Sequence, residues 1–144
     1  MSNVINLDEA LTTKQDLSYK GETYTFRFSD KTQQAMREAW VKANALVKQL
    51  TDEDKKKDNS IDKKPVDEQL KFVRNTIRQE RDIIMAFFED TVGKDKADRL
   101  YHDLNESTDG LLFVLGLVKR ASEKAIKDAE NKEYPAFDGN KDND

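Results

Sequence analysis

The first clear pattern in the sequence is a short run with a period of two. Within residues 17–28, aromatic side chains occupy every second position from Tyr24 to Phe28, which is typical of a strand with one buried face. The pair Lys20-Gly21 separates this run from an earlier alternating one, and glycine supplies the positive φ of a tight turn. The pattern therefore predicts a β-hairpin. Because a lone hairpin is marginal in water, we expect its aromatic face to pack on helices.

Apolar residues then recur at steps of three and four, which predicts helices over most of the remaining chain. The first helix follows Ser29-Asp30, either of which can cap it, and Asp30 with Gln33 has the spacing of a capping box. Its apolar stripe consists of Met36, Trp40, Ala43, Val47 and Leu50. The second helix begins near Pro65 and ends at Gly93, which suits the C′ position. Its apolar positions are Val66, Leu70, Val73, Ile77, Ile83, Ile84, Phe87 and Phe88.

Two further helices complete the predicted fold. A short one covers about residues 95–104, and a last one follows Ser107 and Thr108, either of which can cap it. The last helix is apolar on nearly every side over residues 111–118. The fold class is therefore mainly α: a small helical bundle of about four helices with an N-terminal β-hairpin packed against it.

The length of 144 residues fits one domain with its own core. We interpret residues 1–16 as a flexible N-terminal arm and residues 17–130 as the hairpin plus helical domain. Residues 51–65 form a charged loop in which five acids balance five lysines, so a flexible linker is favoured over a polyanion site. Residues 131–144 are expected to be a disordered acidic tail.

Composition narrows the classes of function. Lys plus Arg number 25 and Asp plus Glu number 29, which gives a net charge of −4 and argues against a dedicated nucleic-acid binder. The absence of cysteine excludes disulfides and cysteine-ligated zinc. The N-terminal residues lack the basic region of a secretory signal, and no apolar run approaches the 20 or so residues of a membrane span. We therefore expect a cytoplasmic protein.

The search for catalytic or metal-binding residues identifies none. His102 lies four residues after Asp98, but one histidine and one carboxylate are too few ligands for a protein-only zinc site. His102 is therefore interpreted as a surface or helix-end residue. Gly93-Lys94 lacks the other residues of a phosphate-binding loop, and no nucleophile motif is present. The sequence predicts a protein that is not an enzyme and needs no cofactor or metal.

Three arginines recur at near-helical spacing in the second helix and could contact phosphates. They are Arg74, Arg78 and Arg81, and Glu80 and Asp82 interrupt the patch that they form. A solvated helix face with local ion pairs explains this pattern better than a nucleic-acid site.

The helices carry more bulky apolar residues than a single narrow stripe requires. Apolar surface that the chain does not bury itself would mark an interaction site, although each single residue is more often simply core. The candidate partner-binding residues are Trp40, Val47, Phe87, Phe88, Leu112 and Leu115.

The order of these parts resembles the tail assembly chaperones of long-tailed bacteriophages that infect Gram-positive hosts. The resemblance rests on the hairpin LSYKGETYTFRFSD at residues 17–30, which leads into a capped helix with Trp40. It continues with FFEDTVG at residues 87–93, then NESTD at residues 105–109 before the final apolar helix. It covers about residues 15–130.

The resemblance implies a binding role in the host cytoplasm. Chaperones of this family coat the long, apolar, helical tape measure protein and keep it soluble until the tail tube polymerises, and they often self-associate. The implied partners are the tape measure protein, the major tail protein as a further candidate, and a second copy of the chain as a homo-oligomer, with no nucleic acid and no membrane. Two other classes stay open: a small structural phage component such as a head-tail connector, and a helical nucleic-acid-binding regulator.

Overall fold

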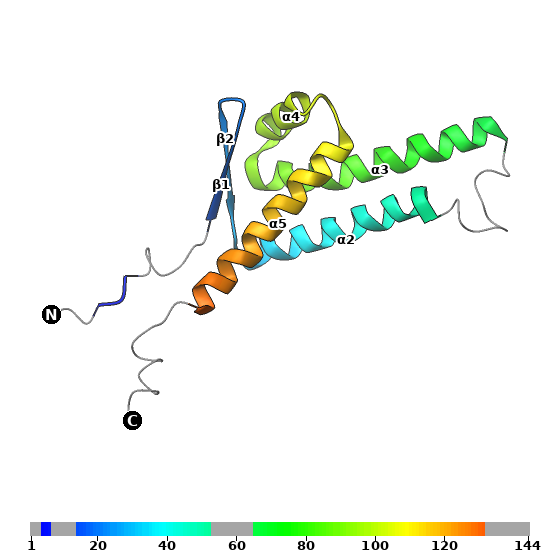
Figure 1. The fold of residues 1–144 in the computed structure, drawn as a ribbon. Helices are drawn as coiled ribbons and strands as arrows, with labels where there is room; N and C mark the ends of the chain where they lie inside the picture. Colours follow the sequence, from blue (N-terminus) through cyan, green and yellow to red (C-terminus); the bar gives the residue numbers. More distant parts are fainter. Residues whose placement is uncertain (1–3, 7–13, 53–64, 132–144) are drawn as a thin grey trace.

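The computed structural model describes residues 4–6, 14–52 and 65–131. Its elements are β1 (Lys14–Tyr19), β2 (Glu22–Arg27), α2 (Asp30–Asp52), α3 (Val66–Val92), α4 (Lys94–Asp103) and α5 (Thr108–Asn131). The prediction of a mainly helical fold with four helices and an N-terminal hairpin is confirmed (Figure 1). Most of the expected N-terminal arm, charged loop and acidic tail lie outside the described residues. Some residues of these three segments are described. Residues 14–16 of the expected arm belong to β1, residues 51–52 of the expected loop to α2 and residue 131 of the expected tail to α5, so these elements are longer than predicted.

The hairpin has the turn that the sequence indicates. The strands are antiparallel, and Tyr19 pairs with Glu22 across a two-residue loop. Both loop residues have positive φ, 49° at Lys20 and 82° at Gly21. Loops of this kind match the right-handed twist of the two strands. The first strand begins at Lys14, because backbone pairing with β2 starts three residues before the side-chain alternation at Leu17.

Serine side chains cap two of the helices. At the start of α2, the backbone N–H of Thr32 donates to the Ser29 hydroxyl at 3.1 Å. At the start of α5, the backbone N–H of Gly110 donates to the Ser107 hydroxyl at 2.9 Å. Asp30 is already the first residue of α2, so the predicted capping box of Asp30 with Gln33 is wrong. A serine hydroxyl one residue earlier provides the cap instead.

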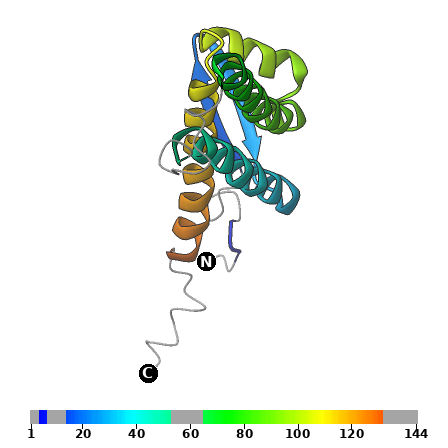
Figure 2. The same ribbon diagram turned by 90° about the vertical axis from the view of Figure 1, so that its right-hand side faces the viewer.

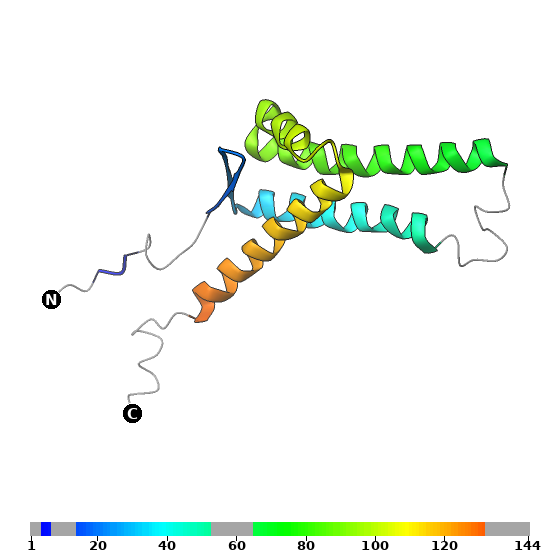
Figure 3. The ribbon, with the colours of Figure 1, turned by 45° about the horizontal axis from the view of Figure 1, so that its top comes forward.

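Helices α2 and α3 lie side by side and antiparallel, and α5 crosses them obliquely (Figures 1 and 2). The hairpin and α4 lie at the end where α2 begins and α3 ends. At the opposite end, the two long helices continue past α5 without a further element beside them among the described residues (Figure 3). We call this part, residues 44–52 of α2 and 66–79 of α3, the projection.

The core lies in the body of the molecule and not in the projection. An aromatic cluster joins the hairpin to α3, with ring centroids of Phe26 at 5.9 Å from Phe88 and 6.4 Å from Phe87. Such contacts stabilise a fold beyond the apolar area that they bury. The other buried apolar residues around this cluster are Tyr24, Met36, Ala39, Ala43, Ile84, Ala97, Leu100, Leu111, Val114, Leu115 and Val118.

Candidate interaction surface

The structure divides the six candidate partner-binding residues into two groups. Phe87, Phe88 and Leu115 are buried core residues. Phe87 and Phe88 contact Phe26 of the hairpin, and Leu115 is buried on α5. The three side chains are therefore not available to a partner in this conformation. Trp40, Val47 and Leu112 are half-buried. The expectation of an accessible surface thus fails for the first three residues, because other elements of the chain already cover them.

Trp40 contributes mainly to the contact between α2 and α5. A Cβ atom built on Gly116 of α5 would lie 3.0 Å from Cζ3 of the Trp40 ring, so a larger residue at this position would require the ring to move by a few tenths of an ångström. The ammonium group of Lys119 lies 5.7 Å from the centre of the same ring, within cation–π range. The half-exposed ring is therefore held in place by α5.

Within the described part of the chain, the longest exposed apolar row lies on α3, in the projection. Val66, Leu70, Val73 and Ile77 expose 67%, 45%, 39% and 37% of their surface. Their spacing of four, three and four residues places them on one side of the helix. We call these four residues the α3 stripe. The periodicity of this row is visible in the sequence, but its exposure is not.

The stripe is uncovered because α5 crosses only part of α3. The same helical row continues as Glu80, Ile84 and Phe88, which are all buried. Glu80 interacts electrostatically with Asp109, which lies in the first turn of α5. The row is therefore covered from Glu80 to Phe88, toward the body, and exposed from Val66 to Ile77, in the projection. On the neighbouring helix of the projection, Val47 is half-buried.

Smaller apolar features lie elsewhere on the described surface. Phe113 and Leu117 are exposed one turn apart on α5, and Val41 is exposed on α2. A shallow, open groove of about 240 Å³ also runs between α2 and α3 in the body. It is lined by Ala35, Glu38, Ala39, Lys42, Ile83, Ala86, Phe87 and Asp90. None of these features forms a row as long as the α3 stripe.

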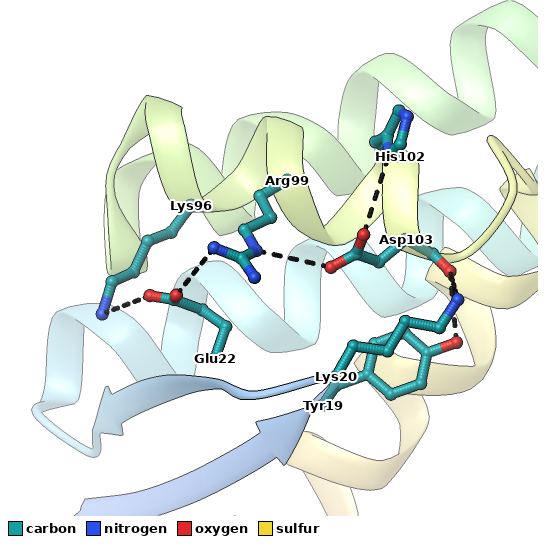
Figure 4. Close-up of polar contacts among 7 residues, drawn as sticks. All are labelled: Tyr19, Lys20, Glu22, Lys96, Arg99, His102 and Asp103. Carbon is teal, nitrogen blue, oxygen red and sulfur yellow. Dashed lines mark hydrogen bonds and ion pairs between the residues drawn. The ribbon is translucent and has the colours of Figure 1, made fainter.

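Charged residues gather where the hairpin meets α4 (Figure 4). The Glu22 carboxylate lies 3.3 Å from the Lys96 ammonium and 3.1 Å from the Arg99 guanidinium. Arg99 also reaches the Asp103 carboxylate at 3.5 Å. The opposite charges in this cluster neutralise one another on the protein surface. The ion pairs of Glu22 with Lys96 and Arg99 connect the hairpin to α4.

Side-chain donors of the hairpin complete this attachment. The hydroxyl of Tyr19 and the ammonium of Lys20 donate to the backbone carbonyl of Asp103 at 3.2 and 3.1 Å (Figure 4). His102 lies 3.6 Å from the Asp103 carboxylate, and its side chain is 80% exposed. The interpretation of His102 as a surface residue near a helix end is confirmed.

The carboxyl group of Glu80 is buried, and its hydrogen bonding is incomplete. Glu80 is 2% exposed, and its Oε2 atom has no hydrogen-bond partner among the residues that the structure describes. Burial, and to a lesser extent the nearby Asp109 carboxylate, raise the pKa of Glu80 to about 7. The neighbouring buried hydroxyl of Thr76 donates instead to the Phe72 carbonyl at 2.7 Å. Because the Oε2 atom is enclosed, it has no direct route to a ligand in solution.

The described residues give little else that points to chemistry. Within residues 4–6, 14–52 and 65–131, no three His, Cys, Asp or Glu side chains lie close enough together to hold a metal ion. In the same ranges, no helix combines the length and apolar character that crossing a membrane requires. Comparison with known proteins finds no matching family model, no matching curated protein and no matching solved structure.

Proposed function

We propose that this protein is a non-enzymatic tail assembly chaperone of a bacteriophage, which binds helices of the tape measure protein in the host cytoplasm and keeps them soluble. The order of hairpin and helices supports this proposal through the resemblance described above. The observation that carries it is the α3 stripe, which exposes four large apolar side chains along one side of a helix.

The stripe has the form of a site for an amphipathic helix. It runs about 17 Å along α3 from Val66 to Ile77 at 1.5 Å per residue. An incoming helix with apolar residues at steps of three and four could pack along it, as in other helix-in-groove contacts. On the adjoining side of α3, Lys71, Arg74 and Arg78 are exposed and keep the surface hydrated.

Co-expression with the tape measure protein tests the proposal. The intact chain is expected to increase the soluble fraction of the client and to remain bound when salt is raised, because apolar contacts are not screened. The double variant Leu70→Glu with Val73→Glu is expected to lose this effect, since it places charge in the middle of the stripe. Both residues are exposed, so the variant is expected to fold.

The matched control is Val41→Glu, which adds a charge at an exposed apolar position of α2 outside the stripe. It is expected to behave like the unmodified chain. Equal client solubility with and without the protein would contradict the chaperone proposal. Retention of the protein in finished virions would favour the structural-component alternative, and DNA binding with a steep salt dependence would favour the regulator.

A further inference from the structure

We infer that a second copy of this chain covers the α3 stripe, with the two α3 helices packed antiparallel across a two-fold axis between Leu70 and Val73. This inference goes beyond the proposed function, because it concerns the protein without a client.

The spacing of the stripe is symmetric about its centre. Steps of four, three and four residues read the same in both directions. An antiparallel partner therefore places Val66 against Ile77 of the other copy and Leu70 against the other copy's Val73. A two-fold contact requires a patch that is complementary to itself, and this row meets that requirement.

The charges beside the stripe favour the antiparallel arrangement. Asp67 and Arg74 flank it on the side of α3 opposite the buried Thr76, and both are exposed. Neither makes an ion pair within the described part of the chain. In the antiparallel arrangement each Asp67 approaches Arg74 of the other copy, which gives two equivalent ion pairs. A parallel arrangement would instead place Arg74 near the neutral Gln69 of its partner.

The shape of the molecule favours the same orientation. The hairpin, α4 and α5 all lie toward one end of the α2–α3 pair, and the projection extends from the other (Figures 1 and 3). Antiparallel packing of two projections keeps the two bodies at opposite ends of the contact. Parallel packing would bring both bodies to the same end, where the start of α5 already lies beside Glu80.

The expected contact is modest in size. A stripe about 17 Å long on one helix buries less than the roughly 800 Å² per partner of a standard interface, even with help from Val47. The dimer is therefore expected to be concentration-dependent. Sedimentation of the full chain without client, from about 10 µM to about 1 mM, should show a monomer–dimer equilibrium. A monomer over this whole range would overturn the inference.

Charge exchange tests the predicted pairing. Asp67→Arg alone places two arginines together on each side of the axis and is expected to weaken the dimer about threefold or more. Arg74→Asp alone should weaken it similarly, because it opposes two acids. Combining both changes in one chain restores opposite charges and should recover the dimer. If the double variant is as weak as the single ones, the antiparallel arrangement is wrong.

The absence of native cysteine allows a direct test of orientation. A mixture of the Val66→Cys and Ile77→Cys variants is expected to form a cross-linked heterodimer under mild oxidation, because these positions meet across the axis. Each variant alone should form little cross-linked product. Efficient cross-linking of Val66→Cys to itself would show parallel packing and overturn the inference. Because no client is present, these results are independent of whether the chaperone proposal holds.

Discussion

Phe26→Ala is expected to lower the free energy of unfolding by about 3–5 kcal/mol, the range found for removal of a buried aromatic side chain. Phe26 is fully buried and contacts the rings of both Phe87 and Phe88. Its loss leaves a cavity between the hairpin and α3, and this cluster links the two. Chemical denaturation followed by circular dichroism at 222 nm measures the effect.

Arg27→Ala is the matched control for this change. Arg27 neighbours Phe26 on the same strand but points to solvent, so the change is expected to stay within about 0.5 kcal/mol of the unmodified chain. If Phe26→Ala and Arg27→Ala have similar stabilities, the aromatic cluster does not hold the hairpin on the helices.

Glu80→Gln is expected to remove a pH-dependent loss of stability. Its carboxyl has a pKa raised to about 7 in the folded protein against 4.5 as the ordinary value. Below about pH 4.5 the Glu80 carboxyl is protonated in both the folded and the unfolded protein, so its burial does not require a charge to be buried or neutralised. Between pH 4.5 and 7 only the unfolded state loses the proton, so the stability of the folded protein falls. Above pH 7 both states are ionised and the cost is at its maximum.

The size of this effect follows from the difference between the two pKa values. From pH 5 to pH 8, the stability of the unmodified chain relative to Glu80→Gln should fall by about 2–3 kcal/mol. The cost of burying the amide of the variant does not depend on pH, so it cancels when the difference in stability between the two proteins is compared from one pH to another. Urea denaturation at pH 5, 6, 7 and 8 measures the difference.

Glu68→Gln serves as the control, because Glu68 lies exposed in the first turn of the same helix. Its stability relative to the unmodified chain should change little with pH. A Glu80→Gln difference that stays constant from pH 5 to pH 8 would mean that the Glu80 carboxyl is ionised in the folded protein throughout this range.

Local signals in the sequence were sufficient for the elements themselves. The Lys20-Gly21 turn, the end of α3 at Gly93 and a cap at Ser29 or Ser107 each depend on residues a few positions apart. The structure corrected one of these details, since Ser29 and not the pair Asp30 and Gln33 caps α2. A serine hydroxyl and an aspartate carboxylate are nearly equal as caps, so the sequence did not decide between neighbouring positions.

The candidate surface could be predicted only in part. An excess of apolar residues was visible in the sequence, and the structure does leave some of them exposed. The residues themselves differ, because Phe87, Phe88 and Leu115 are core whereas Val66 and Leu70 are open to solvent. Large aromatic residues are strong candidates for anchors of a contact because of their large apolar area. The same large apolar area favours their burial in the core of a small protein.

Helical spacing in the sequence places one largely apolar row on α3 from Val66 to Phe88, interrupted by Glu80, because this spacing is a local property of the chain. Which half of that row is buried depends instead on how the helices pack in three dimensions. The deciding contact is long-range: α5 begins beside Glu80 and covers the row toward Ile84, and it leaves Ile77 and the residues before it uncovered. The spacing within α3 is the same on both sides of this boundary, and therefore carries no information about where another helix crosses it.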